Sequence, residues 1–378
     1  MPRVERVLIV GAGIAGLALA RKLNSIGIEV DLLERRSHAA AHGAGIFLTG
    51  NAVRVFHDLG LDRILFEHSR PVDMIRFTDQ CERELFHVDL SVKPNWPQFV
   101  SIKRDTLQRI LLDAALPLVP RWGTTIVSLH AQPDRVEVAL SDGTRSHYDL
   151  IVGADGVHSQ VRKMLFGDRV IEPIVHFCGW RFLAPCPARL VTPQYMLGNA
   201  RTLLLHPLPG GEVYCGAGPV VEAGLDGGSE LERMRGAFAA FGGFAAEVLA
   251  TTNSATALIP TRYWHFEKRP WHADGCVLIG DAAHACAPTL AQGGAMALED
   301  ALVLGNLLGQ QLERDEVLVD FEARRVARVA HALAMSLQRM EANRLLGPRE
   351  LALRDFILPR VGASQLLDAW APLMESLP

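Results

Sequence analysis

The first residues that could do chemistry are Gly11, Gly13 and Gly16, spaced as Gly-x-Gly-x-x-Gly. Gly11 permits a tight turn, Gly13 lets the backbone approach a pyrophosphate, and Gly16 lets a helix pack closely on a strand. The amides that begin this helix, around Ala15, attract phosphate. Glu34 ends the next apolar run, where a carboxylate suits two ribose hydroxyls and repels a 2′-phosphate. The pattern predicts a bound dinucleotide without deciding which one.

Two further motifs join glycine to a carboxylate after an apolar run that suits a buried strand. One is the stretch 153–162, which contains Asp155, and the other is 280–300, which begins with Gly280-Asp281. A buried carboxylate at a strand end needs hydrogen-bond donors, which sugar hydroxyls supply. A simple turn for Asp155 and a helix N-cap for Asp281 remain open as alternatives.

In this order, the three motifs resemble those of the FAD-dependent aromatic hydroxylases, the class A flavoprotein monooxygenases typified by para-hydroxybenzoate hydroxylase. The resemblance covers residues 7–310. It implies an α/β fold. A Rossmann-like FAD-binding domain of the glutathione-reductase type would be interleaved with an α+β substrate domain built on an antiparallel sheet, followed by C-terminal helices.

The resemblance also assigns cofactor contacts. Asp281 is expected to hydrogen-bond the ribityl chain, Asp155 to contact FAD and the pyridine nucleotide, and the amides of Gly293 and Gly294 to stabilise negative charge on N1 and O2 of the reduced flavin. For Arg35 and Arg104, solvated surface charge is the alternative. The expected FAD contacts are Gly11, Gly13, Ala15, Gly16, Glu34, Arg35, Gly45, Arg104, Asp155, Asp281, Gly293, Gly294 and Ala295.

One loop departs from the family pattern. The family commonly has Gly-Gln-Gly where this chain has Ala291-Gln292-Gly293. We therefore expect a slightly different path here, with Gly294 keeping the loop pliable.

The activity implied is hydroxylation of a small aromatic or heteroaromatic substrate by FAD, O2 and transiently bound NADH or NADPH, through a flavin C4a-hydroperoxide. The carbonyl of Pro288 is expected to accept the hydroperoxide proton. His206, Tyr214 and Arg181 are candidate bases or proton relays in the middle of the chain, although each could also be an ordinary sheet residue. Apolar candidates for the pocket are Phe47, Leu48, Trp180 and Phe182.

Rival functions stay open. A same-fold flavin reductase, oxidase or halogenase would not hydroxylate, although the Trp-x-Trp-x-Ile-Pro motif of tryptophan-type halogenases is absent. A non-catalytic FAD-binding protein is a remote alternative. The chain has one dinucleotide fingerprint, which favours brief surface docking of NAD(P)H, and it has no CxxC pair for disulfide reduction.

Composition narrows the class. A net charge of −4 and 49% hydrophobic residues describe a globular protein with no nucleic-acid partner. No apolar run reaches the roughly 18 residues of a membrane span. The six cysteines are expected to be reduced thiols, without a metal site, in a cytoplasmic monomer or homodimer.

The elements that must position these residues follow from periodicity and turn signals. The predicted FAD-binding domain comprises residues 1–70, 98–170 and 270–345, the substrate domain 71–97 and 171–269, and a helical segment 346–378. The predicted strands are Val7–Val10, Ile28–Leu33, Val136–Leu140 and Leu150–Val152 around a turn at 141–143, Leu203–His206, Val213–Cys215 and Cys276–Ile279. The predicted helices are Leu17–Ile26, Arg104–Leu116, Ser229–Leu249, Ala295–Gln311 and the region 321–377.

Overall fold

A computed structural model describes residues 3–38, 43–167, 172–221, 228–265, 270–310, 312–342 and 346–375. The side chains of 172–176 and 221 are outside this description. Gln311, where one helix was predicted to end, also lies outside the described residues.

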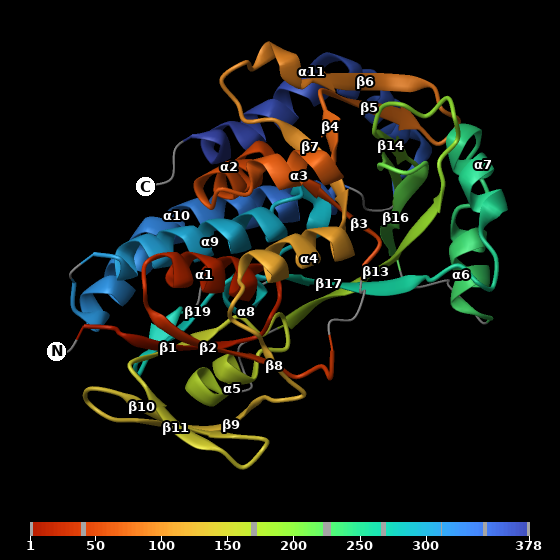
Figure 1. Cartoon of the computed structure of the whole chain (residues 1–378). Coiled ribbons are helices and arrows are strands. Elements are labelled where there is room, and N and C mark those ends of the chain that lie inside the picture. The colour runs from red at the N-terminus through yellow and green to blue at the C-terminus, as the bar shows by residue number, and fades with distance from the viewer. Residues whose placement is uncertain are drawn as a thin grey trace.

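A six-stranded sheet forms the centre of the half that contains the glycine turn (Figure 1). Its inner strands are parallel, and their apolar side chains are buried on both faces, as the uninterrupted run at Val7–Val10 predicts. The strand order is β18 (His272–Ala273), β19 (Cys276–Leu278), β12 (Leu150–Gly153), β1 (Arg6–Val10), β2 (Glu29–Glu34) and β8 (Arg121–Trp122).

Helices cover one face of this sheet. Helix α1 (Ile14–Ser25) begins earlier than predicted because Gly13 already has the extended backbone of an N-cap. It lies against α9 (Gly293–Leu308), which in turn packs on α10 (Arg314–Glu341) (Figure 1). The glycine turn therefore connects the end of β1 in the sheet to the start of α1.

A small antiparallel sheet corrects one prediction. The turn at 141–143 joins β10 (Val136–Leu140) to β11 (Arg145–Tyr148), and not to β12. β9 (Ile126–Ala131) completes this sheet. β11 was missed because its sequence, Arg-Ser-His-Tyr, is mostly polar and exposes two of its four residues.

A seven-stranded sheet forms the other half, and all its pairings are antiparallel except that of β14 with β5. The strand order is β17 (Ile259–His265), β13 (Glu172–Pro185), β16 (Glu212–Val221), β15 (Arg201–Pro207), β14 (Gln194–Leu197), β5 (Met74–Asp79) and β6 (Glu84–Asp89).

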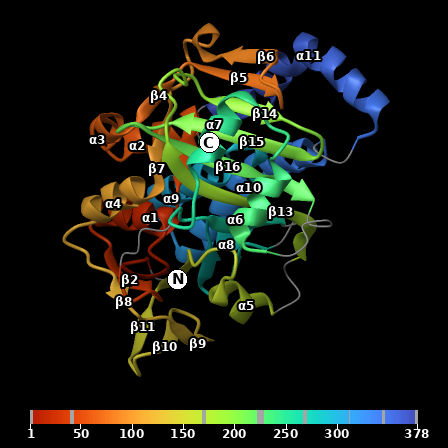
Figure 2. The same ribbon diagram turned by 90° about the vertical axis from the view of Figure 1, so that its right-hand side faces the viewer.

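Two helices cross the outer face of this sheet, where one was predicted (Figure 2). Helix α6 (Glu230–Ala237) starts at a capping box formed by Ser229 and Glu232. Helix α7 (Gly243–Thr251) is a separate helix, because the φ of +53° at Gly243 does not continue a right-handed helix. Their apolar faces pack on the sheet.

A fourth sheet, of three strands, lies between the two halves. Its order is β3 (Gly45–Leu48), β7 (Phe99–Lys103) and β4 (Arg70–Val72). Around it lie α2 (Gly50–Asp58), α3 (Asp62–His68) and α4 (Arg104–Ala114). Helix α5 is Gln160–Phe166, α8 is Asp281–His284, and a 3₁₀ turn covers Pro288–Leu290.

The C-terminal region contains two helices, α10 and α11 (Pro348–Met374), and α11 lies against β6 (Figure 1). The predicted α/β class is confirmed, whereas the exact domain bounds stay a prediction. Within the described ranges, no helix combines the length and apolar character that crossing a bilayer requires.

Candidate active site

The glycine turn is built from backbone packing that excludes side chains at two of its three glycines. Gly11 has a φ of +111°, and a Cβ there would lie 2.4 Å from the carbonyl oxygen of Ala154. A Cβ on Gly16 would lie 1.9 Å from the carbonyl oxygen of Gly11. A Cβ on Gly13 would meet nothing within 4 Å. The turn therefore needs Gly11 and Gly16 for packing, while Gly13 faces open space.

The three glycine motifs come together in space. Gly11 contacts Ala154 and Asp155 of the second motif. A Cβ on Gly280, in the third motif, would lie 3.2 Å from Cβ of Ala15. The parallel pairing of β1 with β12, and of β12 with β19, brings these strand ends to one edge.

Glu34 lies beside the glycine turn. One carboxylate oxygen accepts a hydrogen bond from the amide of Ala12 at 3.1 Å, and the other accepts from the amide of Arg36 at 3.0 Å. The side chain of Arg35 is exposed. Glu34 is therefore oriented by the turn, whereas Arg35 has no fixed partner among the described residues.

The two carboxylate oxygens of Asp155 have different surroundings. Its Oδ2 accepts from the amide of Gln160 at 2.6 Å, at the start of α5. Burial raises the pKa of its carboxyl group. Its Oδ1 is buried and has no hydrogen-bond partner among the described residues. One oxygen thus stabilises the turn, and the other is available to a ligand.

Asp281 is the first residue of α8, and Gly280 is its N-cap. The N-cap alternative is therefore wrong. The side chain is exposed, and its Oδ1 lies 3.9 Å from where a Cβ on Gly293 would be. Burial, followed by the nearby Asp281 charge, raises the pKa of Cys286 to about 12, so this thiol is uncharged. Asp281 and the start of α9 consequently border the same open region.

In the loop before α9, Ala291 adopts a backbone conformation that usually belongs to glycine. Ala291 has a φ of +57° and a ψ of +31°, which is the left-handed conformation. The Pro288 carbonyl accepts a long 3.4 Å hydrogen bond from the amide of Ala291. Helix α9 starts at Gly293 with no side-chain cap, and Ala295 is buried. The amides of its first turn, including that of Gly294, thus lack intrahelical acceptors.

Ala291→Gly is therefore expected to stabilise the protein. A left-handed non-glycine residue costs about 1–2 kcal/mol, and the greater unfolded entropy of glycine offsets about 0.4–1 kcal/mol of that. The free energy of unfolding should rise by about 0.5–1 kcal/mol in urea denaturation. Ala297→Gly, in the regular part of α9, is the control and should destabilise. A loss of stability in Ala291→Gly would contradict the assigned strain.

Arg104 begins α4, and its side chain lies beside Gly43. A Cβ on Gly43 would lie 2.5 Å from its Cδ. Its pKa is lowered by surrounding protein atoms and by the like charge of Arg181, and Asp281 opposes this shift. The side chain is nevertheless exposed to solvent. These observations together put Arg104 in a recessed part of the surface, within range of the Arg181 charge.

One face of the seven-stranded sheet carries the predicted polar candidates. Leu183 pairs with Tyr214 across the strands, so Arg181, two residues before Leu183, shares a face with Tyr214. His206 also pairs with Tyr214, from the other neighbouring strand. Arg181 donates a hydrogen bond to the hydroxyl of Tyr214 at 2.5 Å, and that hydroxyl raises the pKa of the guanidinium. The structure therefore brings Arg181, His206 and Tyr214 together.

Successive side chains of a strand point to opposite faces of the sheet, and this makes two of the predicted pocket residues wrong. Trp180 and Phe182 flank Arg181, so they point to the opposite face and pack under α6 and α7. The Trp180 indole donates to Glu230 at 2.6 Å. Of the other two candidates, Phe47 contacts the His206 ring at a centroid distance of 4.8 Å, and Leu48 is buried in the core.

Strand β3 links this sheet face to the loop that precedes α9 and contains Ala291 and Gln292, here called the α9 loop. A Cβ on Gly45 would lie 2.5 Å from Tyr214, and a Cβ on Gly294 would lie 3.1 Å from Cδ1 of Ile46. A series of close approaches thus runs from Asp281 past the start of α9 and along β3 to Tyr214.

His206 is the centre of a buried chain of hydrogen bonds. Its Nδ1 pairs with Oγ of Ser101 at 2.8 Å and its Nε2 with the hydroxyl of Tyr195 at 3.2 Å. Burial lowers its pKa to about 3, so the ring is neutral. Sequence reasoning missed Ser101 and Tyr195, because no motif marks them. The register of β14 on β15 brings Tyr195 to His206, and the packing of β7 against this sheet brings Ser101.

The neutral His206 predicts acid sensitivity. Its pKa falls from 6.5 to about 3 on folding, so the unfolded chain binds the proton first as the pH drops below 6.5. Stability should fall by about 2 kcal/mol between pH 7 and pH 5 from this residue. Urea denaturation of His206→Gln should lack that loss, whereas His130→Gln, which changes an exposed histidine on β9, should retain it. Identical pH profiles for wild type and His206→Gln would exclude this origin.

A buried ionic cluster lies behind the α9 loop and was also missed. Arg325 donates to Asp300 at 2.8 Å and to Glu299 at 2.6 Å, and all three side chains are fully buried. His284 contacts Asp300 at 2.5 Å, and the amide of Gly280 donates to Asp300 at 2.8 Å. The cluster ties the Gly280–His284 motif to α9 and α10.

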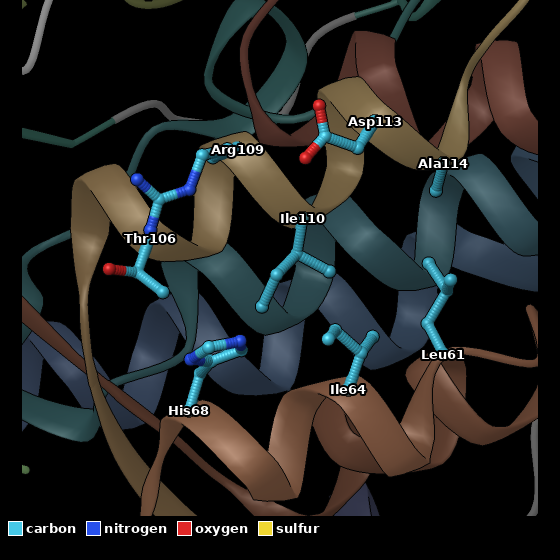
Figure 3. Close-up of a pocket in the computed structure, with 8 residues that line it drawn as sticks. All are labelled: Leu61, Ile64, His68, Thr106, Arg109, Ile110, Asp113 and Ala114. Atoms are coloured by element: carbon cyan, nitrogen blue, oxygen red, sulfur yellow. The ribbon is translucent and has the colours of Figure 1, made fainter.

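A hollow of about 250 Å³ lies elsewhere, between α3 and α4 (Figure 3). Ile64 and Ile110 project into it from the two helices, with His68 and Arg109 toward one end. It shares no residue with the contacts described above.

Comparison with known proteins decides the family. A model of the FAD binding domain matches residues 5–336. The chain also aligns with 2-heptyl-3-hydroxy-4(1H)-quinolone synthase of Pseudomonas aeruginosa at 34% identity, covering 85% of each chain. The chain belongs to the FAD-dependent aromatic monooxygenases. The family resemblance predicted from the three motifs is therefore confirmed.

Two other relatives of this monooxygenase agree. The 3-amino-4-hydroxybenzoate 2-monooxygenase of Streptomyces cremeus is 32% identical, over 86% of this chain and 84% of its own length. The crystal structure of Klebsiella pneumoniae HpxO, complexed with FAD and uric acid, matches with a TM-score of 0.88. It is 23% identical and covers 98% of this chain and 96% of its own, which establishes the shared fold of the monooxygenase.

Proposed function

We propose that this FAD monooxygenase consumes NADH or NADPH and hydroxylates a small aromatic or heteroaromatic substrate. The observation that carries the proposal is the series of close approaches from Asp281 and Gly293, through Gly294 and β3, to Tyr214. Together with the approach of Gly280 to Ala15, it links the glycine turn to a sheet face that carries Arg181, His206 and Tyr214.

The residues present suit FAD. Open space at Gly13 fits a pyrophosphate, and the unpartnered Oδ1 of Asp155 and the carboxylate of Glu34 fit sugar hydroxyls. Arg104 supplies a cation, and the first amides of α9 supply donors for a developing negative charge. Bound FAD would supply the oxygen chemistry through the C4a-hydroperoxide that the family resemblance implies.

The protein side of the reaction is orientation, exclusion of water and proton placement. The Arg181 charge has no carboxylate in ion-pair contact among the described residues, so it favours an ionised phenol, enol or similar group on the substrate. Tyr214 and the neutral His206–Tyr195 pair offer hydroxyls for hydrogen bonding. The Pro288 carbonyl is the proposed acceptor near the flavin.

The test is a substrate screen that follows substrate-stimulated NADH and NADPH oxidation, with product mass analysis under ¹⁸O2. The names of the relatives suggest 4-quinolones, aminohydroxybenzoates and urate as first compounds. Gain of one labelled oxygen supports the proposal. Stimulated oxidation that yields only hydrogen peroxide with every compound would favour the oxidase reading.

Asp281→Ala is expected to weaken FAD binding about ten- to a hundredfold, because one hydrogen bond to a charged group contributes about 1.5–3 kcal/mol. Titration of apoprotein with FAD, followed by flavin fluorescence, measures the change. Asp113→Ala, which changes an exposed carboxylate on α4, is the matched control. Full FAD affinity in Asp281→Ala would remove the ribityl assignment.

A further inference from the structure

The side chain of Gln292 is directed away from the open region and into the protein. It is fully buried. Its Nε2 donates to Oγ1 of Thr49 at 3.0 Å, and its Oε1 accepts from Nδ2 of Asn51 at 3.0 Å. Thr49 also donates to Oδ1 of Asn51 at 2.7 Å. These three side chains, the Gln292 clamp, join the α9 loop to the start of α2.

The clamp is anchored in the buried charges. Asn51 donates a second hydrogen bond from Nδ2, to Oε1 of Glu299 at 2.8 Å. Glu299 is itself held by Arg325 at 2.6 Å and by Arg328 at 2.8 Å. Each member of the clamp has a partner in fixed geometry, and a fully satisfied buried polar network is rigid.

The clamp sits where the loop needs restraint. Gln292 follows the left-handed Ala291 and is the N-cap residue of α9. A strained backbone conformation persists only where the surroundings over-determine it. Gln292 caps nothing with its own side chain, so its hydrogen bonds restrain the loop and leave the amides of Gly293 and Gly294 uncapped.

We propose that Gln292 is a positioning residue for the flavin. With Thr49 and Asn51, it holds Ala291 left-handed and thereby aims the amides of Gly293 and Gly294 toward the pyrimidine end of the cofactor. The inference rests on the proposed placement of FAD at the start of α9. A side chain that does not touch the cofactor thus sets how strongly the protein prefers the reduced flavin.

The test compares Gln292→Leu and Thr49→Val with wild-type holoprotein. Both replacements are nearly isosteric, and Thr49→Val removes only one hydroxyl from the clamp. The two-electron midpoint potential of the bound flavin is measured by dye equilibration. In Gln292→Leu, the preference for reduced over oxidised flavin should fall about tenfold, which is a potential about 30 mV more negative. Thr49→Val should shift the potential in the same direction by a smaller amount.

Val55→Ala, one turn further along α2 and fully buried, is the matched control. It should lower the melting temperature but leave the potential at the wild-type value. An unchanged potential in either Gln292→Leu or Thr49→Val, or an equal shift in Val55→Ala, overturns the inference. FAD binding and substrate hydroxylation by the wild type are measured separately, so an unchanged potential would leave the proposed function intact. A wild type that binds no FAD would remove both.

Discussion

Replacing Arg325 with methionine is expected to cost about 3–5 kcal/mol of stability, a large share of the total for most proteins. Its guanidinium lies between Glu299 and Asp300, and none of the three side chains is exposed. Methionine fills much of the volume, but it leaves two buried carboxylates with less compensating charge. The change is expected to weaken the packing of α10 on α9, the helix that directly follows the α9 loop.

Urea denaturation of the apoprotein measures this loss, with Arg324→Met as control. Arg324 is the neighbouring residue on α10, and its pairing with Asp320 at 2.8 Å is about one-third exposed. Exposed pairs contribute about 0–1 kcal/mol, so the control should stay close to wild type. Equal stability of the two variants would show that the buried cluster is not needed for folding.

The same cluster adds a pH dependence. Burial opposes the charge on Asp300, but His284 and Arg325 outweigh it and lower the pKa of this carboxyl from 3.8 to about 2. A carboxyl whose pKa is lowered by folding contributes stability above its unfolded pKa and loses it as the pH falls through the folded value. Wild type should therefore lose this contribution between about pH 4 and pH 2.

Gly16→Ala is expected to abolish useful FAD binding. The added Cβ would lie 1.9 Å from the carbonyl oxygen of Gly11, so the turn or α1 must move. Overpacking of this kind costs about 1–3 kcal/mol or more, which reaches a loss of affinity of about a hundredfold. Flavin fluorescence titration reports the affinity, and thermal unfolding of the apoprotein reports the strain.

Gly13→Ala separates the two roles of the glycines. A Cβ at Gly13 meets no protein atom within 4 Å, so the apoprotein should keep its stability while FAD binding weakens. Gly236→Ala, on the exposed side of α6 with equally open surroundings, should leave FAD affinity unchanged and raise the stability slightly, because alanine favours a helix over glycine. Wild-type affinity in Gly16→Ala, or unchanged affinity in Gly13→Ala, would contradict the assignment of this turn to the pyrophosphate.

Local sequence determined the nucleotide-binding half of this protein. The run Val7–Val10, the three glycines and Glu34 predict a strand, turn, helix and strand because each depends on neighbours a few residues away. The turn residues of the sequence predicted less of the small antiparallel sheet. The turn at 141–143 was recognised, but the polar strand β11 after it was not, because an edge strand exposed to water shows little hydrophobic alternation.

Tertiary structure alone decided which side chains meet. Arg181 shares a sheet face with Tyr214, and Trp180 turns to the other face, because strand register fixes the side of every residue. Ser101 reaches His206 from another sheet, and Gln292 reaches Asn51 from a distant loop. Burial and long-range hydrogen bonding, which set the neutral His206 and the Arg325 cluster, depend on residues far apart in the chain. A local pattern specifies an element, but only packing specifies its partners.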